Sequence, residues 1–173
     1  MRYVELRRHT DNDGDRLTAQ GVADAEAIGQ HQLHPPYAAL VSTGAARCTQ
    51  MLEILRRAAG QDDIPIAQAT GLRSVVEDRW REAAKVAGKD ADVEAMRAVD
   101  PDLVERESWL LALALRQVVD GLPDGSRVLI VGHSPTNEVA VLGVAGEVVP
   151  PLGKGEGVLL IEDGGHYRVE PLA

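Results

Sequence analysis

Two histidines and two arginines occupy positions typical of an anion-binding site with a nucleophile. Arg8 and His9 directly follow a strand-like segment at the N-terminus, and His133 directly follows a fully apolar one. Arg47 lies in the first turn of a predicted helix, where side chains lean toward the helix N-terminus. Arginine binds phosphate through two parallel hydrogen bonds, and imidazole is largely neutral near pH 7. The four residues therefore predict an anion pocket that contains a nucleophilic imidazole.

These positions depend on strands that alternate with helices along the chain. The predicted strands are Tyr3–Leu6, Ala39–Val41, Ile64–Ala67, Val128–Val131, and a closing hairpin of Val158–Ile161 and Tyr167–Val169. Helical spacing and capping residues predict helices over Thr18–Leu33, Ala45–Ala59, Leu103–Leu122 and Thr136–Val144. This alternation is typical of a three-layer α/β/α domain with a mostly parallel central sheet. Ligands bind such sheets beyond the carboxyl ends of the strands, where the candidate residues fall.

The length of 173 residues fits one domain that spans residues 1–173. Residues 71–102 are charged and weakly patterned, and we interpret them as a surface excursion that could form a lid. Trp80 and Trp109 are interpreted as packing residues. Alternation along the first strand places Arg7 away from Arg8, so we expect Arg7 to be solvated.

The composition is that of a soluble globular protein, with 45% hydrophobic and 26% charged residues. There is no Phe, so Leu, Val and Ala must fill the core. A formal net charge of −9 argues against broad contact with nucleic acid or an anionic membrane. Cys48 is the single cysteine, which excludes an internal disulfide and a cysteine-rich zinc site. With no evident signal peptide or membrane span, we expect a cytoplasmic protein, while the oligomeric state stays open.

Four short motifs occur in order along the chain. They are Leu6-Arg7-Arg8-His9-Thr10, Leu17-Thr18-Ala19-Gln20-Gly21, the segment from Ser42 to Arg47, and Val131-Gly132-His133-Ser134. In order and spacing they resemble the motifs of the histidine phosphatase superfamily, also called phosphoglycerate mutase-like, over about residues 2–145. The resemblance implies the phosphoglycerate mutase-like version of the three-layer fold.

The resemblance also implies a two-step phosphatase mechanism that needs no metal ion or other cofactor. His9 attacks phosphorus and forms a phosphohistidine, which water then hydrolyses. Arg8, Arg47 and His133 hold the phosphoryl oxygens and stabilise the charge of the transition state. The phosphate-binding residues that the resemblance suggests are Arg8, Thr10, Arg47, His133 and Ser134.

Two departures from the family pattern concern phosphate binding and the proton donor. Thr10 stands where the family usually has Gly, so its side chain either crowds the phosphate or donates to it. Larger members carry an acidic residue in a Leu-x-Glu segment, and Leu72-Arg73-Ser74 has Ser at that position. The nearest carboxylates are Glu77 and Asp78, and Glu77 is the candidate general acid.

The short chain and the missing acid are similar to the small phosphohistidine phosphatases of the SixA type. A phosphorylated imidazole needs less acid assistance to leave than an alkoxide does. The predicted substrate is therefore protein phosphohistidine or, alternatively, a small phosphate ester of a phosphomonoesterase or mutase-like enzyme. Two rival readings are a weakly catalytic domain that binds phosphate, and a serine hydrolase that uses Ser134 with His166 as base.

Overall fold

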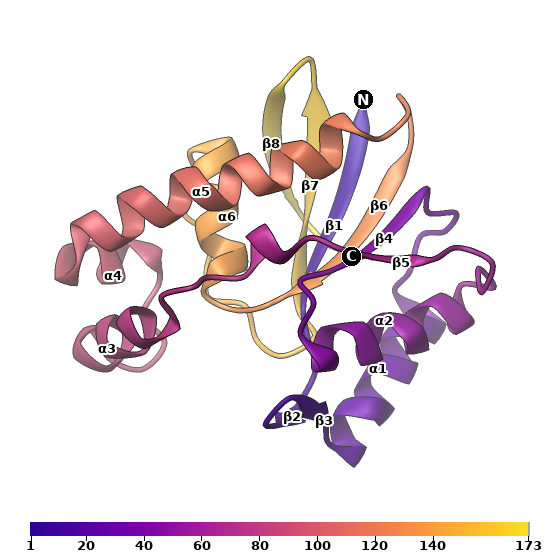
Figure 1. The fold of residues 1–173 in the computed structure, drawn as a ribbon, viewed down its shortest axis with the longest axis horizontal. Helices are drawn as coiled ribbons and strands as arrows, with labels where there is room; N and C mark the ends of the chain where they lie inside the picture. The colour runs from indigo at the N-terminus through magenta and orange to yellow at the C-terminus, as the bar shows by residue number, and fades with distance from the viewer. Residues whose placement is uncertain (173) are drawn as a thin grey trace.

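A six-stranded sheet forms the centre of the molecule (Figure 1). The computed structural model describes residues 1–172. In the order in which they pair, the strands are β5 (Ile66–Gln68), β4 (Ala39–Ser42), β6 (Arg127–Gly132), β1 (Arg2–Arg8), β7 (Gly157–Asp163) and β8 (His166–Pro171). The first four run parallel, and β7 and β8 form an antiparallel hairpin beside β1. The predicted mostly parallel sheet is confirmed.

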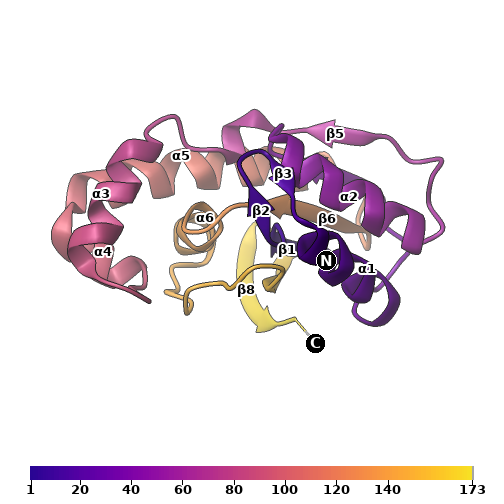
Figure 2. The same ribbon diagram turned by 90° about the horizontal axis from the view of Figure 1, so that it is seen from below.

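Helices cover both faces of the sheet (Figures 1 and 2). They are α1 (Ala19–His31), α2 (Ala46–Ala58), α3 (Glu77–Ala87), α4 (Val93–Val99), α5 (Pro101–Asp120) and α6 (Thr136–Ala145), with a 3₁₀ turn η1 (Thr70–Leu72) and a small hairpin of β2 (Asn12–Asp13) and β3 (Arg16–Leu17). Helices α1 and α2 lie on one face and α5 and α6 on the other, with α3 and α4 beside α5. This is the predicted three-layer α/β/α arrangement. Within residues 1–172, no helix has the length and apolar composition of a membrane span.

Strand β6 shows why the core is aliphatic on both sides of the sheet. Val128 and Ile130 pack with α5 and α6, whereas Leu129 and Val131 pack with α1 and α2. All four are fully buried, because successive side chains of a strand point to opposite faces and both faces are covered. With parallel neighbours on both edges, β6 holds its carboxyl end in a fixed position.

The loop that follows β1 is fixed against α1. The Thr18 hydroxyl oxygen accepts a hydrogen bond from the Gly21 N–H at 3.0 Å, so Thr18 caps the helix as predicted. A Cβ at Gly21 would lie 2.0 Å from the Asp11 carbonyl oxygen, so only glycine allows the loop this close to the helix. The helix ends at His31 rather than at the predicted Leu33.

Residues 71–102 contain α3 and α4, and one side of each helix belongs to the core. Trp80, Ala83, Val93 and Met96 are buried in the cluster that α5 and α6 also form. Trp80 is therefore a packing residue, as expected. Trp109 is not a packing residue, since 66% of its surface is exposed. The buried residues of α5 face the core, and Trp109 lies on the opposite side of this helix. A lid role for this segment stays a prediction.

Two charged side chains of β1 are buried, and both have polar partners. Glu5 is fully buried and accepts hydrogen bonds from Arg127 Nη1 at 2.7 Å and from the Tyr37 hydroxyl at 2.8 Å. Arg7 is 2% exposed and donates to the Gly155 carbonyl oxygen at 3.2 Å. The expectation of a solvated Arg7 is wrong, because alternation only moves it to the other face of a strand that is covered on both sides.

The Tyr37→Phe substitution tests the buried Glu5 cluster. It removes the hydroxyl that donates to Glu5, so we expect the free energy of unfolding to fall by about 1–3 kcal/mol. Tyr3→Phe is the matched control, since the Tyr3 hydroxyl is exposed and contacts only the Met1 sulfur at 3.8 Å. That variant should stay within about 0.5 kcal/mol of wild type. Urea unfolding measures both, and equal stabilities for the two variants would contradict this account of Glu5.

Candidate active site

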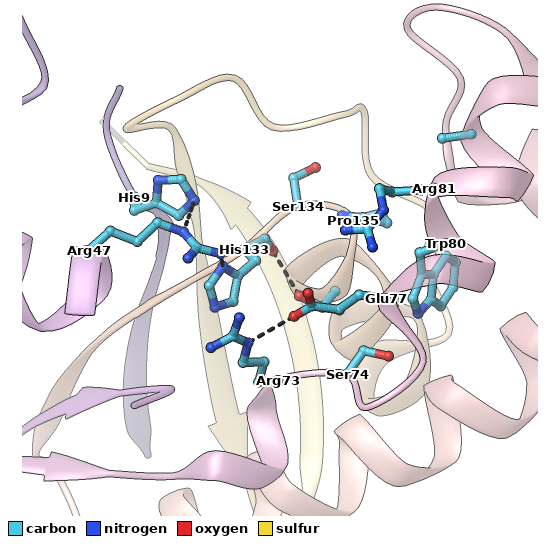
Figure 3. Close-up of a pocket in the computed structure, with 12 residues that line it drawn as sticks. His9, Arg47, Arg73, Ser74, Glu77, Trp80, Arg81, His133, Ser134 and Pro135 are labelled. Atoms are coloured by element: carbon cyan, nitrogen blue, oxygen red, sulfur yellow. Dashed lines mark hydrogen bonds and ion pairs between the residues drawn. The ribbon is translucent and has the colours of Figure 1, made fainter. Parts of the chain in front are cut away.

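A cavity of roughly 300 Å³ opens at the carboxyl edge of the sheet (Figure 3). Parallel pairing places Arg8 opposite Gly132, so His9 and His133 follow neighbouring strand ends. Both histidines line the cavity together with Arg47 from the first turn of α2. Three of the four residues that the sequence singled out for catalysis thus share one wall.

His9 presents its Nε2 atom to Arg47 and the cavity. Its Nδ1 lies 2.8 Å from the Thr10 carbonyl oxygen, which can only accept, so Nδ1 carries the hydrogen. Arg47 Nε donates to Nε2 at 3.2 Å, which uses the Nε2 lone pair. Burial, followed by the charges of Arg47 and Arg8, lowers the pKa of His9 to about 4. The ring is therefore neutral near pH 7, and its available lone pair is on Nε2.

His133 has the opposite tautomer. Its Nδ1 accepts a hydrogen bond from Arg47 Nη2 at 3.1 Å, and its Nε2 donates to the Thr43 hydroxyl at 2.9 Å. Burial, followed by the charge of Arg47, lowers the pKa of His133 to about 3. The centroids of the His9 and His133 rings are 5.5 Å apart. One guanidinium thus donates to two neutral imidazoles.

Asp15 holds this guanidinium in place. Its carboxylate accepts hydrogen bonds from the Arg47 side chain at 2.9 Å and from the backbone N–H groups of Ala46 and Arg47 at 3.1 and 3.2 Å. Partial burial raises the pKa of Asp15, but these hydrogen bonds outweigh burial and lower it. The sequence offered no signal for this role, because Asp15 reaches the start of α2 from the turn between β2 and β3.

Arg8 borders the cavity without lining it. It lines an adjoining hollow, where its Nη1 donates to the Leu152 carbonyl oxygen at 2.7 Å. Ser134 lines both the cavity and this hollow, and its hydroxyl donates to Glu138. The phosphate-binding roles of Arg8 and Ser134 stay predictions, with both residues placed at the boundary between the two spaces.

Thr10 does not face the cavity. Its side chain is 1% exposed, and its hydroxyl donates to the Gly21 carbonyl oxygen at 2.7 Å. The expectation that this hydroxyl donates to phosphate is therefore corrected. The close approach of the loop to α1 at Gly21 draws the hydroxyl toward the helix, and the Thr10 carbonyl oxygen orients His9 instead.

The α3 side of the cavity carries two arginines that the sequence motifs did not indicate as phosphate-binding residues. Arg73 and Arg81 line it beside the candidate acid Glu77 (Figure 3). Arg73 Nε donates to Glu77 at 2.8 Å, and this hydrogen bond raises the pKa of Arg73. The Glu77 carboxylate is thus paired with Arg73 across one turn of the chain. The one feature of the sequence that could have drawn attention to Arg73 is its position in Leu72-Arg73-Ser74, the segment that differs from the family motif.

Cys48 lies directly behind His133. Its sulfur is 3.7 Å from His133 Nε2, and burial raises the pKa of the thiol to about 11. It is therefore a buried, protonated thiol. Among residues 1–172, no three His, Cys, Asp or Glu side chains are grouped as a metal site would require.

The serine hydrolase reading requires His166 near Ser134. His166 pairs with Asp163 in the β7–β8 hairpin, and the neighbouring Glu162 pairs with Arg2 at the start of β1. His166 therefore lies at the amino end of β1, at the opposite edge of the sheet from Ser134. That reading is wrong.

No family model matches the sequence, and no curated protein matches it significantly. The fold matches that of a phosphoglycerate mutase from Bacillus anthracis str. Sterne, with a TM-score of 0.73 at 17% identity over 98% of this chain and 91% of the other. Bacillus stearothermophilus YhfR matches with a TM-score of 0.71 at 20% identity, over 99% of this chain and 96% of the other. A phosphoserine phosphatase from Entamoeba histolytica, in complex with 3-phosphoglyceric acid, matches with a TM-score of 0.75 at 16% identity, over 98% of this chain and 95% of the other. The chain therefore has the phosphoglycerate mutase-like fold.

The lowered pKa values predict that His9 and His133 stay neutral as the pH falls from 7 to about 5. Between an ordinary histidine pKa of about 6.5 and about pH 4, the unfolded chain takes up protons at these rings while the folded chain does not, so stability decreases as the pH falls. NMR titration of the imidazole carbons measures this, with His9→Asn and His133→Asn assigning the signals. A midpoint near pH 6.5 for either ring would contradict the described burial.

The Asp15→Asn substitution tests the anchoring of Arg47. An amide loses the charge and one acceptor, so we expect phosphate binding to the protein to weaken by about tenfold, the equivalent of one charge-assisted hydrogen bond. Asp13→Asn, an exposed carboxylate in the same small hairpin, is the control and should bind as wild type does. Calorimetric titration with inorganic phosphate measures both. Equal affinities in the two variants would show that Asp15 does not position Arg47.

Proposed function

We propose that the protein is a phosphatase that transfers a phosphoryl group to Nε2 of His9 and then to water. The observation that carries this proposal is the neutral His9 ring, held through Nδ1 by Thr10, with Nε2 beside Arg47. A fixed nucleophile next to a guanidinium is the arrangement that phosphoryl transfer requires. Solved structures of the same fold include a phosphoglycerate mutase and a phosphoserine phosphatase, and this supports phosphoryl chemistry.

In the first step, the phosphoryl group enters between the two imidazoles and the arginines. Arg47 exchanges its hydrogen bonds with the rings for hydrogen bonds with phosphoryl oxygens, which frees Nε2 of His9 to attack. The Nε2–P bond forms while the bond from phosphorus to the leaving group breaks. The Thr10 carbonyl oxygen then stabilises the positive phosphoimidazole through its Nδ1 hydrogen. On the α3 side of the cavity, the phosphoryl group competes with Glu77 for the Arg73 guanidinium.

In the second step, water attacks phosphorus and the N–P bond breaks. The water oxygen becomes the fourth oxygen of inorganic phosphate, and the ring returns to its neutral Nδ1–H form. Before substrate enters, the Nε2 hydrogen of His133 is bound to Thr43 and its Nδ1 accepts from Arg47. Its role in holding a phosphoryl oxygen stays part of the proposal and requires a proton on Nδ1 once Arg47 has turned to the phosphoryl group.

Two substrate classes fit this site. Protein phosphohistidine is supported by the Glu77–Arg73 ion pair, because a phosphoimidazole needs less acid assistance and this carboxylate is committed. A small phosphate ester is supported by the size of the cavity, roughly 300 Å³, and by a solved structure of the same fold that is named a phosphoserine phosphatase. We propose that the protein hydrolyses a phosphate monoester or phosphohistidine. A direct comparison of the two substrates in one assay distinguishes these classes.

The His9→Asn substitution tests the nucleophile. It removes the attacking nitrogen, so we expect kcat/KM for p-nitrophenyl phosphate and for a phosphohistidine peptide to fall by more than about 10³-fold. Wild type quenched during turnover should carry acid-labile phosphate, and peptide mapping should place it on His9. His31→Asn, a change at an exposed histidine, is the control and should retain full activity.

Two results would contradict the proposal. Wild type that binds phosphate but turns over neither substrate would favour the rival reading of a binding domain. Loss of the trapped phosphate in Ser134→Ala, together with its retention in His9→Asn, would place the nucleophile elsewhere.

A further inference from the structure

We propose that Ser134 and Glu138 together deliver the proton to the leaving group, which extends the substrate range to phosphate esters of weakly acidic alcohols. This inference rests on the proposed phosphatase function and adds to it a route for the proton. Ser134 would be the catalytic residue that touches the leaving oxygen. Glu138 would act through Ser134.

The described residues that line the cavity include no unpaired carboxyl group that could donate a proton to the leaving group. Glu77 is the only carboxylate there, and Arg73 holds it as an ion pair at 2.8 Å. His9 is the nucleophile, and the Nε2 hydrogen of His133 is bound to Thr43 at 2.9 Å. An alkoxide leaving group nevertheless gains about 10²–10⁴-fold from a positioned acid.

Ser134 is placed to bridge the cavity and a buried carboxyl group. It directly follows His133 and lines both the cavity and the adjoining hollow. Its hydroxyl is hydrogen-bonded to Oε2 of Glu138, which lies in the first turn of α6 and is 2% exposed. Oε1 of Glu138 has no hydrogen-bond partner within the described chain. A buried carboxylate with an unpaired oxygen is costly, so the neutral acid is favoured.

The charged residues around Glu138 come from four segments of the chain. Those that line the hollow with it are Arg8 of β1, Arg81 and Lys85 of α3, Lys89 and Asp90 of the following turn, and Glu156 before β7. Burial raises the pKa of Glu138, whereas the Ser134 hydroxyl, then the nearby backbone N–H groups of Glu138 and Leu152, and then the charge of Arg8 lower it, and burial dominates. The carboxyl group therefore holds its proton to higher pH than an exposed glutamate does.

The proton balance of the step is simple. With Glu138 protonated, its carboxyl group donates to the Ser134 oxygen, and the Ser134 hydrogen turns to the leaving oxygen. As the Nε2–P bond forms and the P–O bond breaks, the leaving oxygen takes the Ser134 hydroxyl hydrogen, and Ser134 takes the proton of Glu138. In the second step the attacking water gives one hydrogen to Ser134, which returns its own to the Glu138 carboxylate. One turnover therefore restores both residues.

Leaving groups of different acidity test this route. We expect Glu138→Gln to lower kcat/KM for an alkyl phosphate such as phosphoserine by about 10²-fold or more, while p-nitrophenyl phosphate and phosphohistidine peptide change by less than about threefold. Ser134→Ala should lower kcat/KM for the alkyl phosphate by at least about tenfold more than for the other two substrates, since any loss of phosphate binding affects all three alike. In the wild type, kcat/KM for the alkyl phosphate should fall at high pH as Glu138 loses its proton, and Glu138→Gln should lack that fall.

Asp90→Asn is the matched control. It removes another carboxylate of the same hollow, at a positive φ of 61° that asparagine tolerates, and should leave both substrates unaffected. A Glu138→Gln variant that loses activity equally on all three substrates would show only a contact that supports the start of α6, and would overturn the proposal. Unchanged alkyl phosphate hydrolysis in both Glu138→Gln and Ser134→Ala would also overturn it. Wild type that is inactive on all three substrates would instead refute the phosphatase function itself. If Glu138→Gln does not fold, as judged by thermal melting, Ser134→Ala decides alone.

Discussion

The parallel pairing of β1 with β6 is the constraint on which the site depends. At its end, the His9 N–H donates to the Gly132 carbonyl oxygen at 3.0 Å, and this bond brings His9 and His133 to adjacent strand ends. Asn137 of α6 strengthens the same seam by donating to the Arg7 carbonyl oxygen at 3.0 Å. A Cβ at Gly132 would lie 2.5 Å from the Asn137 side-chain oxygen, so a larger residue there would separate α6 from β1. The distance between the two imidazoles is thus set by the backbone.

The electrostatics of the site are local. The protein carries a formal net charge of −9, yet three arginines line the cavity, and each is paired with a carboxylate: Arg47 with Asp15, Arg73 with Glu77 and Arg81 with Asp78. Burial, and then the charges of Arg47 and Arg8, keep the His9 imidazole neutral. A phosphate dianion would then meet guanidinium groups already in place, with little reorganisation at the moment of reaction.

The fold, and the meeting of His9, Arg47 and His133 at one edge of the sheet, could be predicted from local patterns, because the sequence shows the periodicity of its strands and helices. Contacts between distant segments could not. Asp15 anchors Arg47 only because the small hairpin folds onto the start of α2. Thr10 turns toward α1 because Gly21 leaves room for the loop. Trp109 shares the helical pattern of α5 with buried residues, and only the rotation of the helix against the sheet shows that it is exposed.

The scarcity of aromatic residues has an optical consequence. The chain has two tryptophans, and they differ in solvent exposure and in polar contacts, two properties that govern fluorescence. Trp80 is 3% exposed, donates to the buried Glu107 at 3.2 Å and lines the cavity, whereas Trp109 is 66% exposed on α5. Caesium ion in solution, a cation that the arginines of the cavity repel, would quench the emission of Trp109 and leave that of Trp80. The residual emission would then come from the wall of the cavity, so the protein contains its own reporter of what enters the site.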